Sequence, residues 1–362
     1  MKKKCFLFIG IPIIIVLQIF SSCSKTEEPF AAIVPQEFIR AADLSFLPLI
    51  ESENILYYNA NNQVENALTT LKNAGCNTIR IRLWKNPIDS QSSLAQVKTL
   101  SQHVKQAGMK VWLCVHYSDT WADPGAQTLP AEWQSLSFTD LEIAVTNYTS
   151  TVLTQIQPDI IQIGNEINAG FMWPAGNLIS NESQFLQLLS SASSVIRTQS
   201  PTTKIMLHFA GIGADARWFF NKVSSINYDY IGLSYYPIWH GKNLNEVKTT
   251  ITTLGQTHNK KVIIAETSYP FTLGWNDWTN NVLGANDQII PTFPATPEGQ
   301  KNFMLALKST IQQTQNGLGF CYWGTEWIAF RGNQSTNGSS WENQAMWDFN
   351  NKALPVMQVF NP

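Results

Sequence analysis

Short apolar runs alternate with amphipathic stretches along most of this chain. Runs of mainly apolar residues, typical of buried strands, occur at residues 38–43, 78–84, 109–116, 159–164, 204–208, 230–234, 260–265 and 319–323. Apolar residues recur at helical spacing over residues 63–73, 92–106, 140–155, 182–198, 214–223, 245–258 and 298–313. These alternations predict an α/β fold, a single-domain (β/α)8 TIM barrel. An open, doubly wound sheet is the alternative, but no glycine-rich phosphate loop follows the first run.

The segments that follow these runs are rich in polar and aromatic residues. Residues 116–124 (HYSDTWADP) follow the third run, and residues 235–241 (YYPIWHG) follow the sixth. Two long segments, residues 272–297 and 325–347, follow the seventh and eighth runs. Parallel barrels carry their active sites at the carboxyl ends of the strands, where all these segments belong. The sequence therefore predicts a substrate cleft at that end, enlarged by the two long loops.

The amino-terminal residues have the order of a secretory signal peptide. Lysines at residues 2–4 precede sixteen uncharged residues, 5–20, fewer than the roughly 20 that a membrane-spanning helix needs. Small residues then lead to Cys23, a pattern that resembles the lipobox of bacterial lipoproteins. We expect a lipoprotein-type signal peptide over residues 1–22, a lipidated tether over residues 23–34 and the (β/α)8 domain over residues 35–362. Ordinary cleavage near Ser22, without a lipid, is the alternative.

A lipid on Cys23 implies an exported lipoprotein that is held in the outer membrane through that residue. Glu27 and Glu28 follow soon afterwards, as in bacterial lipoproteins that are displayed on the cell surface. We therefore expect an outward-facing location, although the sequence leaves the periplasmic leaflet open.

The charge balance argues against a nucleic-acid partner, and the cysteine content argues against a disulfide framework. The chain has 24 basic and 26 acidic residues, and no basic cluster stands out after the first residues, so we expect no nucleic-acid partner. Cys76, Cys114 and Cys321 are odd in number and lack metal-ligand spacing, which favours buried thiols over a disulfide framework. We expect a monomer.

Two glutamates a hundred residues apart carry the candidate chemistry. Glu166 follows the fourth apolar run in the segment IGNEIN, and Glu266 follows the seventh in the segment VIIAETS. Both strand ends face one cleft in a barrel, so the two side chains can converge there. A facing pair of carboxyl groups is the machinery of glycoside hydrolysis. The structural alternative, in which each glutamate caps a loop or pairs with an arginine, does not explain why the arrangement occurs twice.

Longer motifs around these glutamates resemble those of glycoside hydrolase family 53, the endo-β-1,4-galactanases. They are residues 78–84 (TIRIRLW), 116–124, 162–168, 232–241, 265–270 and 341–346 (WENQAM). The Asn-Glu pair is shared by a wide clan of retaining (β/α)8 hydrolases, whereas residues 116–124 and 232–237 (GLSYYP) are more specific. The resemblance implies hydrolysis of β-1,4-galactan, such as the side chains of pectic arabinogalactan, with no cofactor required for catalysis.

The same resemblance assigns the central roles. Glu166 is expected to be the general acid/base and Glu266 the nucleophile, with both on strands four and seven of a retaining enzyme. The acid must hold its proton, which calls for a raised pKa, while the nucleophile must be ionised. Asn165 is expected to hydrogen-bond the sugar 2-hydroxyl at the cleavage subsite.

Cationic and phenolic groups are expected to support the nucleophile. Arg82 is predicted to keep Glu266 ionised, and Arg80, on the same side of the strand, is the less favoured choice. Tyr236 is predicted to hydrogen-bond Glu266, with Tyr235 as the alternative if the strand register differs by one residue.

Further side chains are expected to line the cleft. His116 and His208 end the third and fifth runs, although a structural hydrogen bond explains a strand-end histidine nearly as well. Trp323 is the candidate floor of the cleavage subsite, since aromatic faces stack on sugar rings. The remaining candidates for substrate contact are Asp119, Trp121, Trp239 and Trp327.

Some bacterial members of the family carry a calcium ion between the loops after strands seven and eight. The corresponding segments here are residues 274–281 and 339–342, whose oxygen donors make a structural calcium a candidate. Only two donors are charged, and the usual acidic spacing is not kept. The candidate ligands are Asp277, Asn280, Ser339 and Glu342.

Two other functions remain open. The same glutamates suit a retaining hydrolase of another β-linked plant polysaccharide, such as mannan or xylan. A surface glycan-binding lipoprotein without hydrolytic activity is the alternative from another class. Such a protein has no chemical need for both glutamates together with Asn165 and Arg82, so the hydrolase is favoured.

Overall fold

A computed structural model describes residues 1, 2, 4 and 37–362 of the chain. Residues Glu37–Pro362 form one compact unit. The expected signal peptide and tether, with the lipidation site Cys23, lie outside the described residues apart from residues 1, 2 and 4. In the described part of the chain, no helix has the length and apolar character needed to cross a membrane.

Eight parallel strands close into a barrel in sequence order, with β1 paired to β8. The predicted (β/α)8 fold is therefore confirmed, and every apolar run identified in the sequence forms a strand. The seventh strand runs further than predicted, so Glu266 lies within it and not beyond it. The strands are β1 (Ile39–Asp43), β2 (Thr78–Leu83), β3 (Lys110–Val115), β4 (Ile160–Ile163), β5 (Lys204–Ala210), β6 (Tyr230–Ser234), β7 (Lys261–Thr267) and β8 (Gly317–Tyr322).

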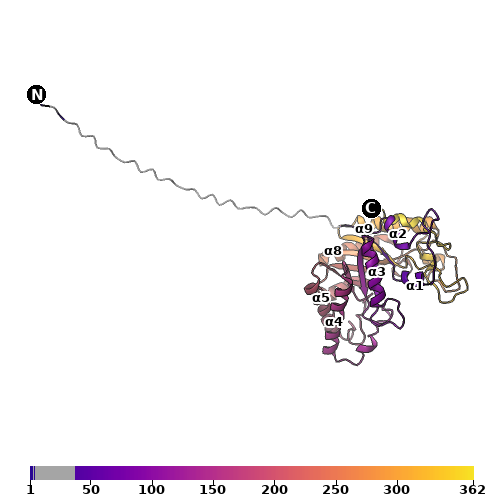
Figure 1. The fold of residues 1–362 in the computed structure, drawn as a ribbon, viewed down its shortest axis with the longest axis horizontal. Helices are drawn as coiled ribbons and strands as arrows, with labels where there is room; N and C mark the ends of the chain where they lie inside the picture. Colours follow the sequence, from indigo (N-terminus) through magenta and orange to yellow (C-terminus); the bar gives the residue numbers. More distant parts are fainter. Residues whose placement is uncertain (3, 5–36) are drawn as a thin grey trace. The chain divides into compact units, whose positions relative to one another are not determined.

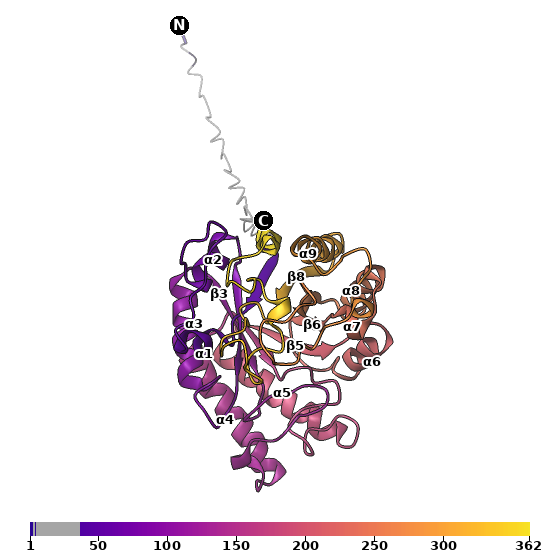
Figure 2. The same ribbon diagram turned by 90° about the vertical axis from the view of Figure 1, so that its right-hand side faces the viewer.

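Helices surround the strands in the order of the chain (Figure 1 and Figure 2). In Figure 2 the C-terminal segment lies between α2 and α9, from opposite ends of the barrel sequence. Asn66 caps α2 through Leu68 N–H, so this helix begins later than the predicted residue 63. The helices are α1 (Leu47–Ser52), α2 (Ala67–Asn73), α3 (Leu94–Gln106), α4 (Phe138–Ile156), α5 (Glu182–Gln199), α6 (Ala214–Lys222), α7 (Pro237–His240), α8 (Leu244–His258) and α9 (Pro297–Gln312). The short helices α1 and α7 were not predicted.

The barrel interior has an apolar layer below and a polar layer above. Successive inward-facing residues show the change: Met206 is followed by His208 on β5, and Ile160 by Gln162 on β4. The apolar layer consists of Ile39, Ala41, Trp112, Ile160, Met206, Tyr230, Ile263, Ala265, Leu318 and Cys321. Burial of a large apolar side chain contributes about 1.5–3 kcal/mol, so this layer stabilises a floor for the polar groups above it.

Two long loops, residues 268–296 after β7 and residues 323–354 after β8, bind each other above the barrel. Backbone hydrogen bonds join Phe271 to Asn343 (2.9 Å) and Val282 to Ser340 (3.0 Å). The side-chain amide of Asn343 also donates to the Leu283 carbonyl (2.7 Å). The three predicted thiols, Cys76, Cys114 and Cys321, are free and buried, which confirms that prediction.

Candidate active site

Glu166 and Glu266 converge at the carboxyl ends of β4 and β7. One carboxylate oxygen of each lies within 4.8 Å of the other. Glu266 is part of an extended strand, whereas Glu166 lies on a turn with a φ of 47°. Gly164 begins that turn with a φ of 74°, and a Cβ there would lie 2.4 Å from a methyl carbon of Ile167. A glutamate in this left-handed conformation costs energy, and such strain is concentrated at functional sites.

Glu266 is held by two donors. The Arg80 guanidinium donates to one carboxylate oxygen (2.8 Å), and the Tyr236 hydroxyl donates to the other (3.1 Å). Arg80 is buried and also pairs with Asp43 at 2.8 Å. The buried guanidinium favours the ionised form of the Glu266 carboxyl group. The geometry therefore agrees with the prediction for Tyr236 over Tyr235, whose hydroxyl donates to the Gly241 carbonyl.

Arg82 does not hold Glu266, which corrects the prediction. Its Nε donates to the Ser92 hydroxyl (3.0 Å), and its guanidinium carbon lies 4.0 Å from the centre of the Trp121 ring. Both arginines face the barrel interior because they are two residues apart on β2. Only Arg80 lies at the depth of Glu266; Arg82 is enclosed by Phe46, Trp84 and Trp121.

Glu166 has a different set of partners. The Ser234 hydroxyl donates to its Oε1 (2.5 Å), and His208 Nε2 lies 3.0 Å from the same hydroxyl. Burial raises the pKa of Glu166 to about 8, and the nearby charge of Glu266 adds to that rise. Burial also raises the pKa of Glu266, but Arg80 and the Tyr236 hydrogen bond oppose it. Of the two carboxyl groups, Glu266 is therefore the one that ionises first.

Asn165 precedes Glu166 in the chain and shares the Arg80 guanidinium with Glu266. Its Oδ1 accepts from Arg80 (2.8 Å), and its Nδ2 donates to the Ala122 carbonyl (2.9 Å). These bonds fix the amide, which is 6% exposed at the wall of the cleft. The fixed side chain can present its amide edge to a sugar hydroxyl.

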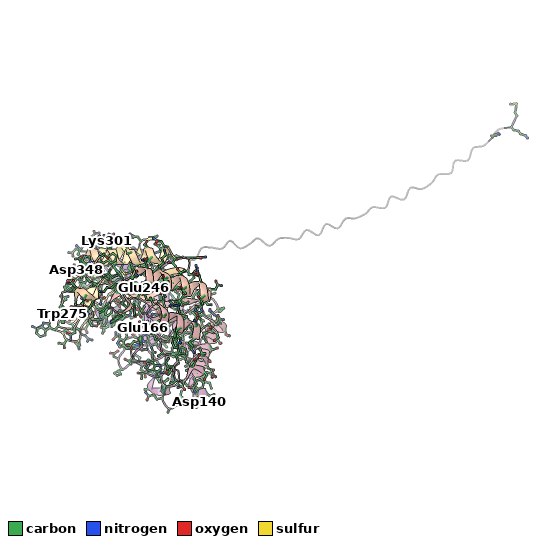
Figure 3. The ribbon with its side chains drawn as sticks, turned by 180° about the vertical axis from the view of Figure 1, so that it is seen from behind. Asp140, Glu166, Glu246, Trp275, Lys301 and Asp348 are labelled. Atoms are coloured by element: carbon green, nitrogen blue, oxygen red, sulfur yellow. The ribbon has the colours of Figure 1, made fainter. Side chains whose placement is uncertain are left out.

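An open cleft of about 320 Å³ surrounds the two glutamates. Trp121, Trp239, Trp323 and Trp327 line it, as the sequence analysis expected. Trp341 also lines it, with its ring 4.7 Å from that of Trp323. Figure 3 labels Glu166 in the middle of the folded unit and Trp275 at its edge. The full lining is Trp121, Ala122, Asp123, Asn165, Glu166, Tyr236, Trp239, Glu266, Val282, Trp323, Trp327, Ser340 and Trp341.

Two residues predicted to meet substrate serve the scaffold instead. His116 is buried, and its Nδ1 accepts from the Ala122 backbone (3.1 Å) beneath Trp121. The Asp119 carboxylate accepts from the backbone N–H groups of Asn86 (2.9 Å) and Ala131 (2.8 Å), so it braces loops. His208 is also fully buried, and its Nε2 lies 3.0 Å from the Ser234 hydroxyl.

Of the four predicted calcium ligands, only Asp277 and Glu342 have oxygen atoms placed to bind a cation. Asp277 and Glu342 are neighbours, since the Asp277 N–H donates to Glu342 Oε1 (3.3 Å). Within the described residues, Asp277 Oδ2, Glu342 Oε2 and Asn281 Oδ1 are buried without a hydrogen-bond partner, which suits a hard cation. The Ser339 hydroxyl donates to the Trp327 carbonyl, and Asn280 is exposed. The oxygen donors that fit are therefore those of Asp277, Asn281 and Glu342, and the predictions for Asn280 and Ser339 are corrected.

Sequence reasoning missed three contributors to the site. Ser234 carries a single hydroxyl at the end of β6, and Asp43 ends β1. Trp341 belongs to a recognised motif but was given no role. Ser234 likewise belongs to a recognised motif, residues 232–237, but was given no role. For Asp43, the available signal was its place at the carboxyl end of a strand, where a barrel gathers its active site.

Comparisons with known proteins agree with this geometry. The model of glycosyl hydrolase family 53 matches residues 39–360. An arabinogalactan endo-β-1,4-galactanase of Cellvibrio japonicus is 34% identical over 343 residues, which cover 89% of this chain and 90% of that protein. The structure of a family 53 catalytic domain from Ignisphaera aggregans is 36% identical with a TM-score of 0.85, covering 91% and 97% of the two chains.

A structure from work on two fungal β-1,4-galactanases is 31% identical, with a TM-score of 0.77, and covers 89% of this chain and 98% of that one. These matches extend over nearly the whole described domain, including both glutamates. The chain belongs to glycosyl hydrolase family 53 and is a glycoside hydrolase.

Proposed function

We propose that this protein is a retaining endo-β-1,4-galactanase. The observation that carries the proposal is the approach of Glu166 and Glu266 to within 4.8 Å. Retaining enzymes place their two carboxyl groups about 5–5.5 Å apart, whereas inverting enzymes separate them by about 6.5–9.5 Å to admit a water. The short separation leaves no room for that water and favours double displacement.

The reaction divides into two steps. Ionised Glu266 attacks the anomeric carbon as Glu166 protonates the departing glycosidic oxygen, which gives a glycosyl-enzyme and a free chain end. Glu166, now ionised, then removes a proton from a water that attacks the same carbon and releases Glu266. Two carboxyl groups and water complete this chemistry without a cofactor.

The substrate is proposed to be β-1,4-galactan, such as the side chains of pectic arabinogalactan. The galactanase names of relatives that match nearly the whole chain support this choice. The aromatic walls of the cleft offer flat faces for sugar rings, and the cleft is open to solvent on one side. An open cleft lets a long chain lie across the site, which favours cleavage inside the chain.

We also propose export as a lipoprotein, with Cys23 carrying the lipid in the outer membrane, an outward-facing location and a monomeric state. The order of lysines, uncharged residues and cysteine at the amino terminus supports the anchor. Metabolic labelling with a radioactive fatty acid tests it. Label in the parent protein and its loss in Cys23→Ser are expected, whereas an unlabelled parent would exclude the anchor.

The substrate proposal is tested by incubating the mature chain with linear β-1,4-galactan, mannan and xylan in parallel and separating the products over time. Short galacto-oligosaccharides are expected early and only from galactan, with no products from Glu166→Gln. Products from mannan or xylan alone would assign another β-linked substrate. Binding without cleavage of any of the three would favour a glycan-binding protein.

A further inference from the structure

A buried chain of polar side chains leads from the barrel interior to Glu166. Gln162 on β4, His208 on β5 and Ser234 on β6 each have no exposed surface. Gln162 Nε2 lies 2.9 Å from His208 Nδ1, His208 Nε2 lies 3.0 Å from Ser234 Oγ, and Ser234 Oγ lies 2.5 Å from Glu166 Oε1. The retaining mechanism proposed above does not by itself require any of these three residues.

The direction of the hydrogen bonds in this chain can be derived from its far end. Trp112 Nε1 and Arg80 Nε, which can only donate, both point to Gln162 Oε1 (3.2 and 3.3 Å). This fixes the amide orientation, so the Gln162 NH2 group faces His208 Nδ1 (2.9 Å), the Gly164 carbonyl (3.0 Å) and Asn165 Oδ1 (3.1 Å). The Glu166 backbone N–H approaches the same nitrogen (3.3 Å). Nδ1 therefore accepts.

The imidazole is neutral with its proton on Nε2. Burial, together with the charge of Arg80, lowers the pKa of His208 well below its ordinary value. Asn165 Oδ1 lies 3.2 Å from Nδ1, but this oxygen already accepts from Arg80 and Gln162. The Nε2 proton then points at Ser234 Oγ, which leaves the serine proton to be donated to Glu166 Oε1.

We propose that His208 and Ser234 are positioning residues that reserve Oε1 of Glu166 as an acceptor, so that the catalytic proton is carried on Oε2. The inference rests on the proposed role of Glu166 as the acid. Oε2 is the oxygen left free to meet the glycosidic oxygen, and the serine hydrogen bond fixes the plane of the carboxyl group. A hydrogen bond donated to a carboxylate also favours its ionised form.

Other groups act on Glu166 as well and must be held constant in a test. They are Glu266 on β7, Arg80 on β2, Asp123 after β3 and Tyr236 after β6. Glu266 is the strongest of these and is coupled to Glu166 in titration. Its charge is therefore removed by working in a Glu266→Gln background.

The direct test is a 13C NMR titration of the Glu166 carboxyl group in the mature chain carrying Glu266→Gln, with the signal assigned by its loss in Glu166→Gln. Ser234→Ala is expected to raise the pKa of Glu166 by about 1 unit, because one charge-assisted hydrogen bond is lost. Ser234→Thr, which keeps the hydroxyl, is the matched control and is expected to leave the pKa in place. An unchanged pKa in Ser234→Ala would overturn the inference.

A second measurement does not depend on any variant folding. 15N NMR of the histidines in the parent chain, with His208 assigned by sequential connectivity, reports which ring nitrogen carries the proton. A neutral ring with the proton on Nε2 is expected, and a proton on Nδ1 would contradict the inference. Neither NMR experiment uses a substrate, so a failure to cleave galactan would be recognised separately.

Kinetics complete the test with Glu266 restored. In Ser234→Ala, the basic limb of kcat/KM is expected to move to higher pH and kcat to fall about 10–100-fold with KM little changed. A merely structural serine would lower activity at every pH without moving the limb, and that result would count against the proposal.

Discussion

The ends of β4 and β7 present the same side chain in two different surroundings. Glu266 lies within its strand and accepts from Arg80 and Tyr236. Glu166 lies on a left-handed turn and accepts from one neutral donor, Ser234. The two carboxyl groups approach to within 4.8 Å, and burial raises the pKa of both, so their different partners distinguish their proposed roles. The Arg80 guanidinium contacts Glu266 on one side of the pair and so distinguishes the proposed nucleophile from the proposed acid.

The largest expected effect comes from removing either carboxyl group. Glu266→Ala should lower kcat about 10⁴-fold or more, because no nucleophile remains, and Glu166→Ala about 10²–10⁴-fold. Azide distinguishes the two roles with a substrate whose leaving group needs no acid. In Glu266→Ala it should attack the face that Glu266 normally occupies and give the α-galactosyl azide, whereas in Glu166→Ala it should intercept the glycosyl-enzyme and give the β-azide.

The same azide configuration from both variants, determined by NMR of the products, would show that the assignment of the two glutamates is wrong. Circular dichroism spectra that match the parent are the control for folding. Glu326, a buried glutamate outside the cleft, offers a further control, since Glu326→Gln should leave the azide chemistry unchanged.

The next largest effect is the loss of activity expected when either of two arginines on β2 is replaced. Arg80→Met should lower kcat/KM about 100-fold, because Glu266 loses its charge-assisted hydrogen bond (2.8 Å). Arg82→Met makes the same change in length and charge, but within the described residues the Arg82 guanidinium meets Ser92 and aromatic rings and not Glu266. It should change kcat less than about 10-fold and act on KM through Trp121. An equal loss of kcat in both variants would contradict the placement of Arg80 as the partner of the nucleophile.

A pH profile separates the two carboxyl groups without removing either. Activity should fall on the basic side as Glu166, whose pKa is raised to about 8 by burial, loses its proton. It should fall on the acidic side as Glu266 gains one. Arg80 and the Tyr236 hydrogen bond both lower the pKa of Glu266, so Tyr236→Phe should move the acidic limb to higher pH. A shift of the basic limb alone would reverse the roles.

The smallest expected effect is on stability. Between about pH 4.5 and 8 the folded protein keeps a proton on Glu166 that the unfolded chain releases, so stability falls as pH rises through this window. Glu166→Gln is neutral at every pH and should raise Tm by a few degrees at pH 8, with little change at pH 4. Glu266→Gln should gain less, because it leaves buried Arg80 with Asp43 as its remaining carboxylate partner. Thermal unfolding of both variants at the two pH values measures the difference.

The sequence predicted the barrel and the positions of both glutamates because these depend on local patterns. Strand runs and helical spacing are properties of contiguous residues, and strand ends determine where side chains gather. Tyr236 was also placed correctly, since the strand β6 was predicted with its true bounds. The helix α1, only six residues long, was missed because it is too short to show a periodic pattern.

The sequence could not predict which of two similar residues on the same strand face contacts a glutamate of the site. Arg80 and Arg82 have the same pattern, and only the stagger of neighbouring strands decides which one reaches Glu266. Asp119 and His116 belong to a functional-looking loop, yet their contacts to backbone N–H groups are visible only in three dimensions. The role proposed for Ser234 depends on its hydrogen bond with His208, which lies on another strand. No local sequence pattern contains that relation.

The short distance between the two carboxyl groups predicts that the anomeric configuration is retained, and this prediction can be tested directly. Proton NMR of galactan digested by the mature chain should show the β-anomer of the new reducing ends during the first minutes, with the α-anomer growing only as mutarotation proceeds. That order would support retention through Glu266. An α-anomer that appears first would mean direct attack by water and would contradict the account of the site.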